Sequence, residues 1–368
     1  MYIHQNKDWP NFNWDNDTLL PYVSTVRDLQ GRLIGRMESL GFELREEAVL
    51  ETLTNDVVKS SAIEGEFLNP HEVRSSIARR LGLDISGLPE ASRDVEGVVE
   101  MMLDATQKYE APLTKDRLCG WHAALFPTGR SGMHKITVGD WRNAAHGPMQ
   151  IVSGPMGREK VHYTAPEAER LESEMNRFIQ WFNTDNSMEP VIKSAIAHLW
   201  FVSIHPFDDG NGRIARAIAD CQLARADRTK QRFYSMSAQI MKSKKEYYNI
   251  LESTQKGSLN VSQWLVWYLE RLTEALEATD VTLSKVLVKA RFWEIHKTTQ
   301  LNKRQIKMIN ILLGDFIGKL HSSKWAKMTK VHRDTARRDI QDLVEKGILS
   351  NSGEGGRSTN YILNLPRF

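Results

Sequence analysis

Cysteine is scarce in this chain of 368 residues, which contains only Cys119 and Cys221. The two lie far apart in apolar, helix-forming surroundings, so we expect reduced buried thiols and no disulfide framework. Long apolar runs are lacking too, and no uninterrupted stretch has the length that spans a bilayer. The first residues have neither the basic segment nor the apolar core of a secretory signal. These absences predict a cytoplasmic protein without a membrane segment.

Net charge is also small, +3 from 49 basic and 46 acidic residues, which does not by itself indicate nucleic-acid binding. There is no internal repeat and no low-complexity segment. Glycine and proline gather mainly in residues 126–166 and 347–357. The remaining composition, 41% hydrophobic and 26% charged, is that of a globular protein, and the length predicts two or three domains.

Apolar residues recur at helical spacing along most of the chain, so we expect a mainly α fold. The predicted helices span residues 16–40, 45–65, 70–81, 90–109, 115–125, 166–184, 190–204, 211–226, 242–254 and 261–292.

The most informative stretch is residues 205–216, His-Pro-Phe-Asp-Asp-Gly-Asn-Gly-Arg-Ile-Ala-Arg. A buried helix leads into His205, and Pro206 cannot continue that helix and favours an extended backbone at His205. A second helix begins at about Asn211. The free N–H groups at a helix start, together with the helix dipole, make an anion site, and the neighbouring glycines let an anion come close.

The side chains of this stretch suit phosphate chemistry. Arg213 and Arg216 share a helix face, and guanidinium groups bind phosphate bidentately. Asp209 supplies a hard oxygen ligand for Mg²⁺. His205, with an ordinary pKa of ~6.5, suits proton abstraction from a hydroxyl. Phe207 is interpreted as an anchor in the core.

Each of these residues also has a plainer interpretation when taken alone. A histidine before proline is most often a loop residue, arginines three apart are usually a solvated face, and Asp208 has the place of a helix N-cap. Taken together, the specified positions are too many for a chance match.

The stretch resembles the signature of the Fic family, H-P-F-x-[D/E]-G-N-G-R-x-x-R, at every position. The resemblance implies an all-helical core and transfer of AMP from ATP to a Ser, Thr or Tyr hydroxyl of a target protein. It implies the following roles: His205 as the base, Asp209 as the Mg²⁺ ligand, Gly210, Asn211 and Gly212 as the anion hole, and Arg213 and Arg216 as the grip on the β- and γ-phosphates.

A β-hairpin is predicted before the helices that lead to the motif. Residues 149–153 and 160–164 are short, partly β-branched runs, separated by a segment rich in glycine and proline. An ordinary surface hairpin would look the same. The family resemblance implies a flap that docks an extended target segment along its edge. Its residues are Ile151, Val152, Ser153, Val161, His162 and Tyr163.

A second resemblance lies upstream, where residues 60–65 fit the pattern [S/T]-x-x-x-E-[G/N] of the family's inhibitory helix. It implies that Ser60, Glu64 and Gly65 form an inhibitory segment in which Glu64 pairs with Arg216 and blocks the γ-phosphate. The alternative for Glu64 is a solvated carboxylate at a helix end.

The C-terminal residues have a different pattern. Helices are expected over 304–316, 322–330 and 333–346, followed by a strand, a glycine-rich turn at 353–360 and a second strand. This order resembles a winged helix, and the run from Arg333 resembles the recognition helices of bacterial repressors. Residues 324–346 carry seven basic and four acidic side chains, and Lys330, Arg333 and Arg337 could contact DNA. A protein-interaction or dimerisation module is the alternative.

We therefore expect a helical N-terminal domain (1–90), a Fic catalytic core (91–290) and a winged helix (300–368). The function implied by the resemblance is protein AMP transfer with ATP as co-substrate and Mg²⁺ as cofactor, restrained by Glu64. Two alternatives stay open, a DNA-binding regulator whose core senses nucleotide and a hydrolase that removes AMP. The sequence names no target protein and leaves open whether the chain modifies itself or forms a homodimer.

Overall fold

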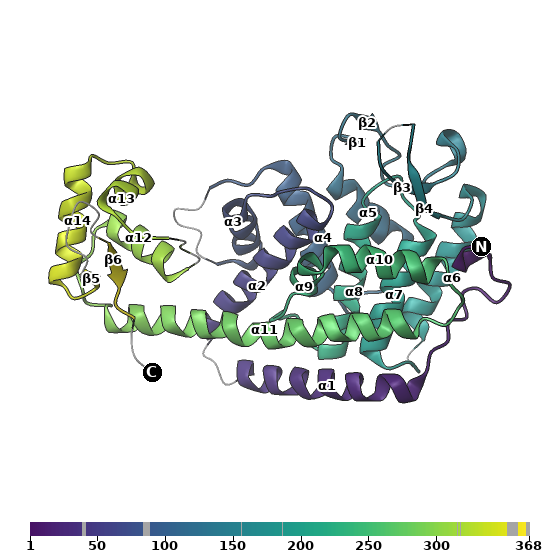
Figure 1. Cartoon of the computed structure of the whole chain (residues 1–368), viewed down its shortest axis with the longest axis horizontal. Coiled ribbons are helices and arrows are strands. Elements are labelled where there is room, and N and C mark those ends of the chain that lie inside the picture. Colours follow the sequence, from purple (N-terminus) through teal and green to yellow (C-terminus); the bar gives the residue numbers. More distant parts are fainter. Residues whose placement is uncertain are drawn as a thin grey trace. The chain divides into compact units, whose positions relative to one another are not determined.

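The computed structural model describes residues 1–38, 42–83, 89–155, 157–185, 187–314, 316, 318–351 and 360–365. Most of these residues lie in helices (Figure 1), so the predicted mainly α fold class is confirmed. The chain forms two compact units, Met1–Thr279 and Asp280–Phe368. The first unit contains the predicted N-terminal domain and most of the predicted core.

The helices of the first unit are α1 Asn16–Glu38, α2 Phe42–Ile63, α3 Pro70–Leu81, α4 Arg93–Gln107, α5 Lys115–Leu125, α6 Leu171–Thr184, α7 Pro190–Ile204, α8 Asn211–Asp227, α9 Met236–Lys242 and α10 Lys244–Gln255. α11, Ser262–Ile295, crosses the boundary between the units. Two hairpins are formed by β1 Arg130–Ser131 with β2 His134–Lys135, and by β3 Gln150–Ser153 with β4 Lys160–Thr164.

Several helices begin where the sequence places a capping residue. Asn69 accepts a hydrogen bond from a backbone N–H of the first turn of α3, and Pro70 occupies its first position. Glu189 and Pro190 do the same for α7, and Thr114 caps α5. A cap satisfies N–H groups that have no partner inside the helix, and proline has no N–H to satisfy. The predicted starts at residues 70, 115 and 190 are therefore confirmed.

The sequence prediction missed one short helix. The predicted helix over 242–254 is present as α10, whereas α9, which ends at Lys242, was not predicted. α9 is a separate short helix, capped by Ser235, whose hydroxyl accepts from the backbone N–H of Ala238 at 3.0 Å. It packs against α2, a contact between distant parts of the chain that local periodicity does not indicate.

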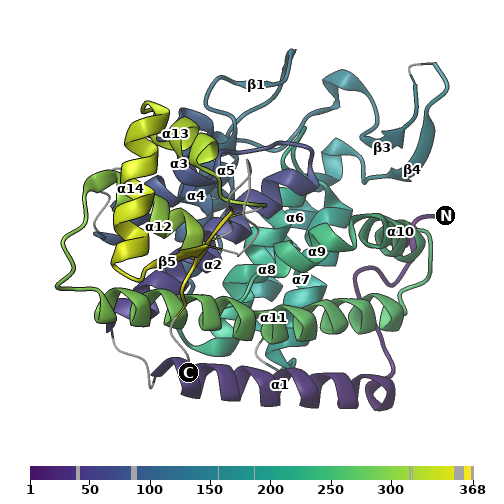
Figure 2. The same cartoon turned by 60° about the vertical axis from the view of Figure 1, so that its left-hand side comes forward.

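The core of the first unit is built around α7. Every residue from Val191 to Ile204 is buried, as expected for a helix that is apolar on all sides. α8 packs along α7, and Trp264 of α11 donates to the carbonyl oxygen of Ala195 at 2.9 Å. On the outside of the unit α1 runs beside α11 (Figure 2).

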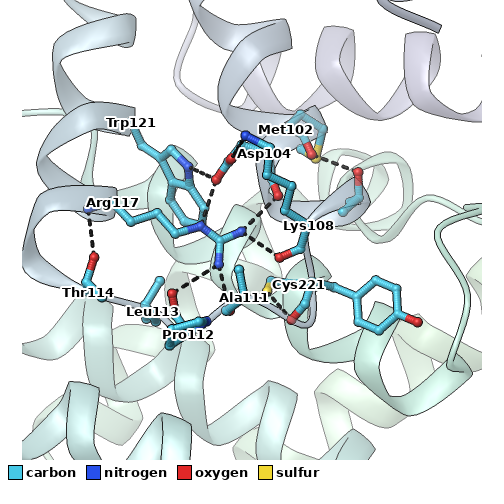
Figure 3. Close-up of polar contacts among 12 residues, drawn as sticks. Met102, Asp104, Lys108, Ala111, Pro112, Leu113, Thr114, Arg117, Trp121 and Cys221 are labelled. Carbon is cyan, nitrogen blue, oxygen red and sulfur yellow. Dashed lines mark hydrogen bonds and ion pairs between the residues drawn. The ribbon is translucent and has the colours of Figure 1, made fainter.

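Arg117 fixes α5 to the end of α4 (Figure 3). Its Nε donates to Asp104 Oδ2 at 2.7 Å, and Nη2 donates to the carbonyl oxygens of Asp104 and Lys108 at 2.8 and 3.1 Å. Arg117 thus adds donors to the carbonyl groups at the end of α4, where helix carbonyls run short of partners. The two helices also approach closely, because a Cβ on Gly97 would lie 1.8 Å from the carbonyl oxygen of Ala124. α5 then leads into Phe126, which borders the site described below.

The second unit contains α12 Lys303–Leu313, α13 Ser322–Thr329, α14 Arg333–Glu345 and an antiparallel pair of strands, β5 Leu349–Asn351 and β6 Tyr361–Leu363. Its core gathers around Trp325, which is fully buried. The order of three helices and two paired strands agrees with the sequence expectation. The predicted glycine turn lies largely outside the described residues, since 352–359 are not described.

None of the helices in the described parts of the chain combines the length and the apolar character needed to cross a bilayer.

Candidate functional site

The loop between α7 and α8 begins with His205 in a left-handed conformation, φ 52° and ψ 59°. The extended backbone predicted for His205 is therefore wrong. Pro206 disfavours the right-handed helical region at the residue before it, and the left-handed region leaves the helix while keeping a closing hydrogen bond. That bond runs from the His205 N–H to the carbonyl oxygen of Phe201 at 3.0 Å.

Arg142, a residue that no sequence pattern singled out, holds this loop. Its side chain is buried, and its Nε donates to the His205 carbonyl oxygen at 2.8 Å. Its Nη2 donates to the carbonyl oxygen of Pro166 at 2.6 Å, and its backbone N–H donates to that of Pro206 at 2.8 Å. The loop carbonyls would otherwise lack partners in a buried place, so Arg142 fixes the backbone that carries His205.

Phe207 is fully buried and stacks on the ring of His122 at 4.2 Å between centroids, which confirms it as an anchor. Asn211 closes the same loop from the helix side. Its amide donates to the Phe207 carbonyl oxygen at 2.8 Å, and its Oδ1 accepts from the Phe207 N–H at 3.0 Å. The Asn211 side chain therefore closes the loop, and its backbone N–H belongs to the uncapped start of α8.

α8 begins after Gly210, whose φ of 79° suits glycine, and no side chain caps the helix there. A Cβ on Gly210 would lie 2.9 Å from Cε2 of Phe126, so the space beside it is closed as well. Asp208 does not cap α8, contrary to one interpretation of the sequence; its Oδ2 accepts from the Thr137 N–H at 2.8 Å. The first N–H groups of α8 are thus without a side-chain cap, as an anion site requires.

Asp209 provides a carboxylate that suits a cation at this helix start. Its Oδ1 accepts from the Gly210 N–H at 2.5 Å, and its Oδ2 contacts the hydroxyl of Ser131. No basic side chain pairs with it in the described part of the chain. Nor do three His, Cys, Asp or Glu side chains gather there around a metal-sized site. Asp209 therefore fits a Mg²⁺ ion that takes its other oxygen ligands from substrate phosphates and water.

The His205 ring is held in its neutral form. Its Nδ1 lies 3.2 Å from the carbonyl oxygen of Val202, so the proton on that nitrogen has an acceptor and the Nε2 lone pair is left to take a proton. Burial lowers the pKa of His205 to about 4. The ring is thus unprotonated at neutral pH, as a general base must be before reaction.

Arg213 and Arg216 both reach the segment that follows α2. Nη2 of Arg216 donates to Glu64 Oε1 at 2.7 Å and to the Ser60 carbonyl oxygen at 2.9 Å, and its Nε donates to the Ser60 hydroxyl at 2.9 Å. Nη1 of Arg213 donates to Glu66 Oε2 at 2.6 Å. The pairing of Glu64 with Arg216 that the family resemblance implied is therefore present in the structure. The sequence did not point to Glu66.

Each of these two arginines keeps a buried nitrogen without a hydrogen-bond partner among the described residues, Nε of Arg213 and Nη1 of Arg216. Buried donors are normally satisfied, so two orphaned donors beside an uncapped helix start indicate a place for a further anion. A polyphosphate fits this donor set.

Glu64 lies tightly against the motif. A Cβ on Gly212 would lie 2.3 Å from Glu64 Oε1, so any side chain at this position would displace the carboxylate from its present place. On its other side the hydroxyl of Tyr248, on α10, lies 3.4 Å from Glu64 Oε2 and 3.2 Å from the carbonyl oxygen of Ile63.

The predicted hairpin is confirmed as β3 and β4, with a register shift between Ile151 and Val152. The Val152 side chain is 48% exposed, and Ile151 and Val161 are half-buried. Tyr163 differs from the expectation, because its side chain is buried and its hydroxyl donates to the Ser203 carbonyl oxygen at 2.7 Å. It anchors the hairpin on the end of α7 and does not face a target.

Ser153 and His162 tie the two strands to each other and to α10. The Ser153 hydroxyl lies 2.5 Å from His162 Nε2, and His162 Nδ1 lies 2.6 Å from Glu252 Oε2. Glu252 belongs to the same helix as Tyr248, one turn further along. α10 therefore contacts both the hairpin and Glu64.

A protein-family model described as the Fic/DOC family matches residues 112–223, which contain the hairpin and the entire 205–216 motif. Residues 112–223 of this chain therefore match a Fic/DOC domain. A second model, a domain of unknown function (DUF4172), matches residues 2–83, the segment that carries Glu64.

Relatives named protein adenylyltransferase Fic share part of this chain. The one from Drosophila virilis is 32% identical over 220 residues, which are 57% of this chain and 39% of that protein. The one from Drosophila grimshawi is 32% identical over 114 residues, 30% of this chain and 22% of that protein. The chain thus spans less than half the length of these relatives.

The fold also has a solved counterpart. A crystal structure of a Fic family protein from Desulfovibrio desulfuricans G20 matches with a TM-score of 0.51 and 21% identity, over 94% of this chain and 96% of that one. The likeness establishes a shared fold.

Proposed function

We propose that this Fic protein transfers AMP from ATP to a Ser, Thr or Tyr hydroxyl of a protein. The observation that carries the proposal is the pairing of a neutral histidine with an anion site a few residues away. His205 is held unprotonated, and Arg213 and Arg216 retain orphaned donors beside the uncapped start of α8.

The reaction follows from these groups. The target hydroxyl gives its proton to His205 Nε2 as its oxygen attacks the α-phosphorus of ATP. The new O–Pα bond forms while the bond from Pα to the bridging oxygen of pyrophosphate breaks. The N–H groups of α8 and the two arginines stabilise charge on the phosphates. Mg²⁺ bound at Asp209 would neutralise part of that charge.

The hairpin supports a protein as the second substrate. β3 is a strand of a two-stranded sheet, so an extended segment can add to its free edge by main-chain hydrogen bonds. The exposed Val152 offers an apolar contact to such a segment. We assign Ser153 and His162 to holding the two strands of this flap together, and Tyr163 to anchoring it.

We propose further that Glu64 restrains the transfer. Its carboxylate occupies Nη2 of Arg216 at 2.7 Å, where a phosphate oxygen of ATP would otherwise bind. Ser60 holds the same guanidinium from behind through its hydroxyl and carbonyl oxygen. Removing Glu64 therefore frees one donor without unsettling the arginine.

Mass spectrometry of the intact protein tests the proposal. We expect Glu64→Gly protein incubated with ATP and Mg²⁺ to gain the mass of one AMP group, and wild-type protein to gain much less. The control is Glu64→Gly/His205→Ala, which should gain none. A gain of AMP that persists without His205 would contradict the assigned base.

A second role is favoured by the second unit, for which we propose binding of double-stranded DNA through α14. The side chains of Arg333, Arg337 and Arg338 are exposed, and no ion pair holds them within the described residues. Two of the acids on this helix are neutralised inside the unit, because Asp339 pairs with Arg304 at 2.7 Å and Asp342 pairs with Lys346 at 2.5 Å. The outer face is thus more basic than the sequence count indicates.

Fluorescence anisotropy with a labelled DNA duplex, measured on the full chain over a range of salt, tests this role. Arg333→Gln/Arg337→Gln should weaken binding about tenfold and lower the slope of log K against log salt by about 2, close to one unit for each lost phosphate contact. Lys303→Gln/Lys307→Gln, which removes the same charge from α12, should matter less. Absence of binding even at low salt would favour a protein-interaction role.

A further inference from the structure

Glu66 makes the second contact between the inhibitory segment and the motif. Its Oε2 lies 2.6 Å from Nη1 of Arg213, whose side chain is 3% exposed while that of Glu66 is 46% exposed. The proposed restraint by Glu64 does not involve this pair. The two motif arginines are therefore each held by a different carboxylate.

A single backbone turn directs the carboxylates of Glu64 and Glu66 to α8. α2 ends at Ile63, and Gly65 adopts a left-handed φ of 89°. The N–H groups of Glu64 and Glu66 both donate to the carbonyl oxygen of Ser61, at 3.0 and 3.1 Å. This is the kind of glycine turn that closes helix ends. Because the chain turns back at Gly65, the residues on either side of it reach neighbouring arginines on one face of α8.

The surroundings of Glu66 do not stabilise the ionised form of its carboxyl group. Burial raises the pKa of Glu66, and the nearby carboxylates of Asp209, Glu64 and Asp94 raise it further, while Arg213 alone opposes them. A half-exposed carboxylate among like charges contributes little to stability. Glu66 instead places a negative charge against the buried Arg213, to which we assign phosphate binding.

We propose that Glu66 is a second inhibitory carboxylate, which occupies Arg213 against the phosphates of the nucleotide as Glu64 occupies Arg216. This inference rests on the proposed transferase function and extends its regulation. Loss of Glu64 alone then leaves Arg213 engaged, so Glu64→Gly is only partly released. The β- and γ-phosphates of the nucleotide must then compete with two carboxylates, whereas the α-phosphate takes no part in that competition.

The opposite role for Glu66 makes the opposite prediction. If Glu66 served to orient Arg213 for phosphate, its removal would weaken ATP binding. The two roles are separated by the sign of one change, and Glu66→Gln keeps the shape of the side chain while removing its charge. Because Glu66 is half-exposed, we expect this variant to keep the native fold, and a thermal melt checks it.

Isothermal titration of ATP with Mg²⁺ tests the inference in a His205→Ala background, which prevents turnover. Adding Glu66→Gln to Glu64→Gly should tighten ATP about tenfold, the usual worth of one charge-assisted contact. AMP, which lacks the β- and γ-phosphates, should bind both proteins alike. Asp94→Asn is the matched control, since it removes a nearby charge without touching Arg213 and should change the ATP affinity little.

The outcomes distinguish the role of Glu66 from the transferase function. ATP affinity that is equal in Glu64→Gly and Glu64→Gly/Glu66→Gln, or weaker in the latter, overturns the role of Glu66 alone. Equal tightening of ATP and AMP, or an equal effect of Asp94→Asn, also overturns it, because the contact with Arg213 would then not be the cause. Failure of both proteins to bind ATP would contradict the transferase function as well.

Discussion

Nε of Arg142 lies 2.8 Å from the carbonyl oxygen of His205, and this contact fixes the backbone of the proposed base. Because Arg142 is buried and its side chain donates to the loop carbonyls of His205 and Pro166, it acts on His205 by position. We expect Arg142→Gln to lower the rate of AMP transfer about 10- to 100-fold in a Glu64→Gly background, since small displacements of a reacting group are costly. ATP affinity should change little.

The measurement compares single-turnover rates and ATP titrations. Arg93→Gln is the control, an exposed arginine at the start of α4. If Arg142→Gln weakened ATP binding and left the rate of transfer unchanged, Arg142 would not be positioning His205.

The lowered pKa of His205 predicts the pH dependence of transfer. An ordinary histidine would be about 90% protonated at pH 5.5, so a base of that kind would lose about tenfold in kcat/KM for ATP between pH 7.5 and 5.5. With a pKa of about 4, His205 stays unprotonated over that range. We therefore expect kcat/KM of Glu64→Gly/Glu66→Gln protein, in which neither carboxylate titrates, to be nearly flat. A fall in kcat/KM with a midpoint near pH 6.5 would contradict the claim that burial lowers the pKa of His205.

Buried histidines also predict a loss of stability in acid. Burial lowers the pKa of His198 to about 3, and the side chain is 1% exposed. In the unfolded chain His198 takes up a proton below pH ~6.5, whereas the folded chain resists it, so the unfolded state binds more protons and stability falls as pH falls. Between pH 7.5 and 5.0 this histidine alone should cost about 2 kcal/mol of unfolding free energy.

Urea unfolding followed by tryptophan fluorescence measures this dependence. His198→Gln preserves a partner for the Tyr247 hydroxyl, which lies 2.8 Å from His198 Nε2, and cannot titrate. Its stability should fall less than that of the wild type between the two pH values. Equal losses of unfolding free energy in the two proteins would show that His198 does not cause the loss of stability in acid.

The contact between Glu252 and His162 predicts the stability of the flap. Loss of its charge-assisted bond at 2.6 Å should open the hairpin more often. We expect Glu252→Gln to speed amide hydrogen exchange in residues 150–164 by about tenfold. Glu246→Gln on the same helix should leave it unchanged. Unchanged exchange in Glu252→Gln would mean that other contacts hold the flap, with buried Tyr163 the foremost.

Local sequence signals predicted much of the fold. Apolar residues at helical spacing predicted the helices that start at residues 70, 115 and 190, and the structure shows Asn69, Thr114 and Pro190 at these starts. α9 was missed because its existence depends on packing against α2, far away in the sequence. The left-handed backbone of His205 was missed because the proline rule excludes one region and does not choose between the others.

The site could be predicted where a motif spans neighbouring residues, and not where it depends on tertiary contacts. The pairing of Glu64 with Arg216 came from family resemblance and is present in the geometry. Arg142, Tyr248 and Glu252 carry no pattern of their own. Glu66 stood beside a recognised pattern, and the left-handed turn at Gly65, which only a structure shows, explains why it also reaches α8.

The central claim is that the group transferred from ATP is AMP, and the position of a radioactive label tests it most directly. Glu64→Gly protein is incubated with Mg²⁺ and with ATP labelled at either the α- or the γ-phosphate, then denatured and counted. The account predicts stable label on protein from α-labelled ATP, none from γ-labelled ATP, and none from either when His205 is also replaced by alanine. Label transferred from the γ-phosphate would contradict it.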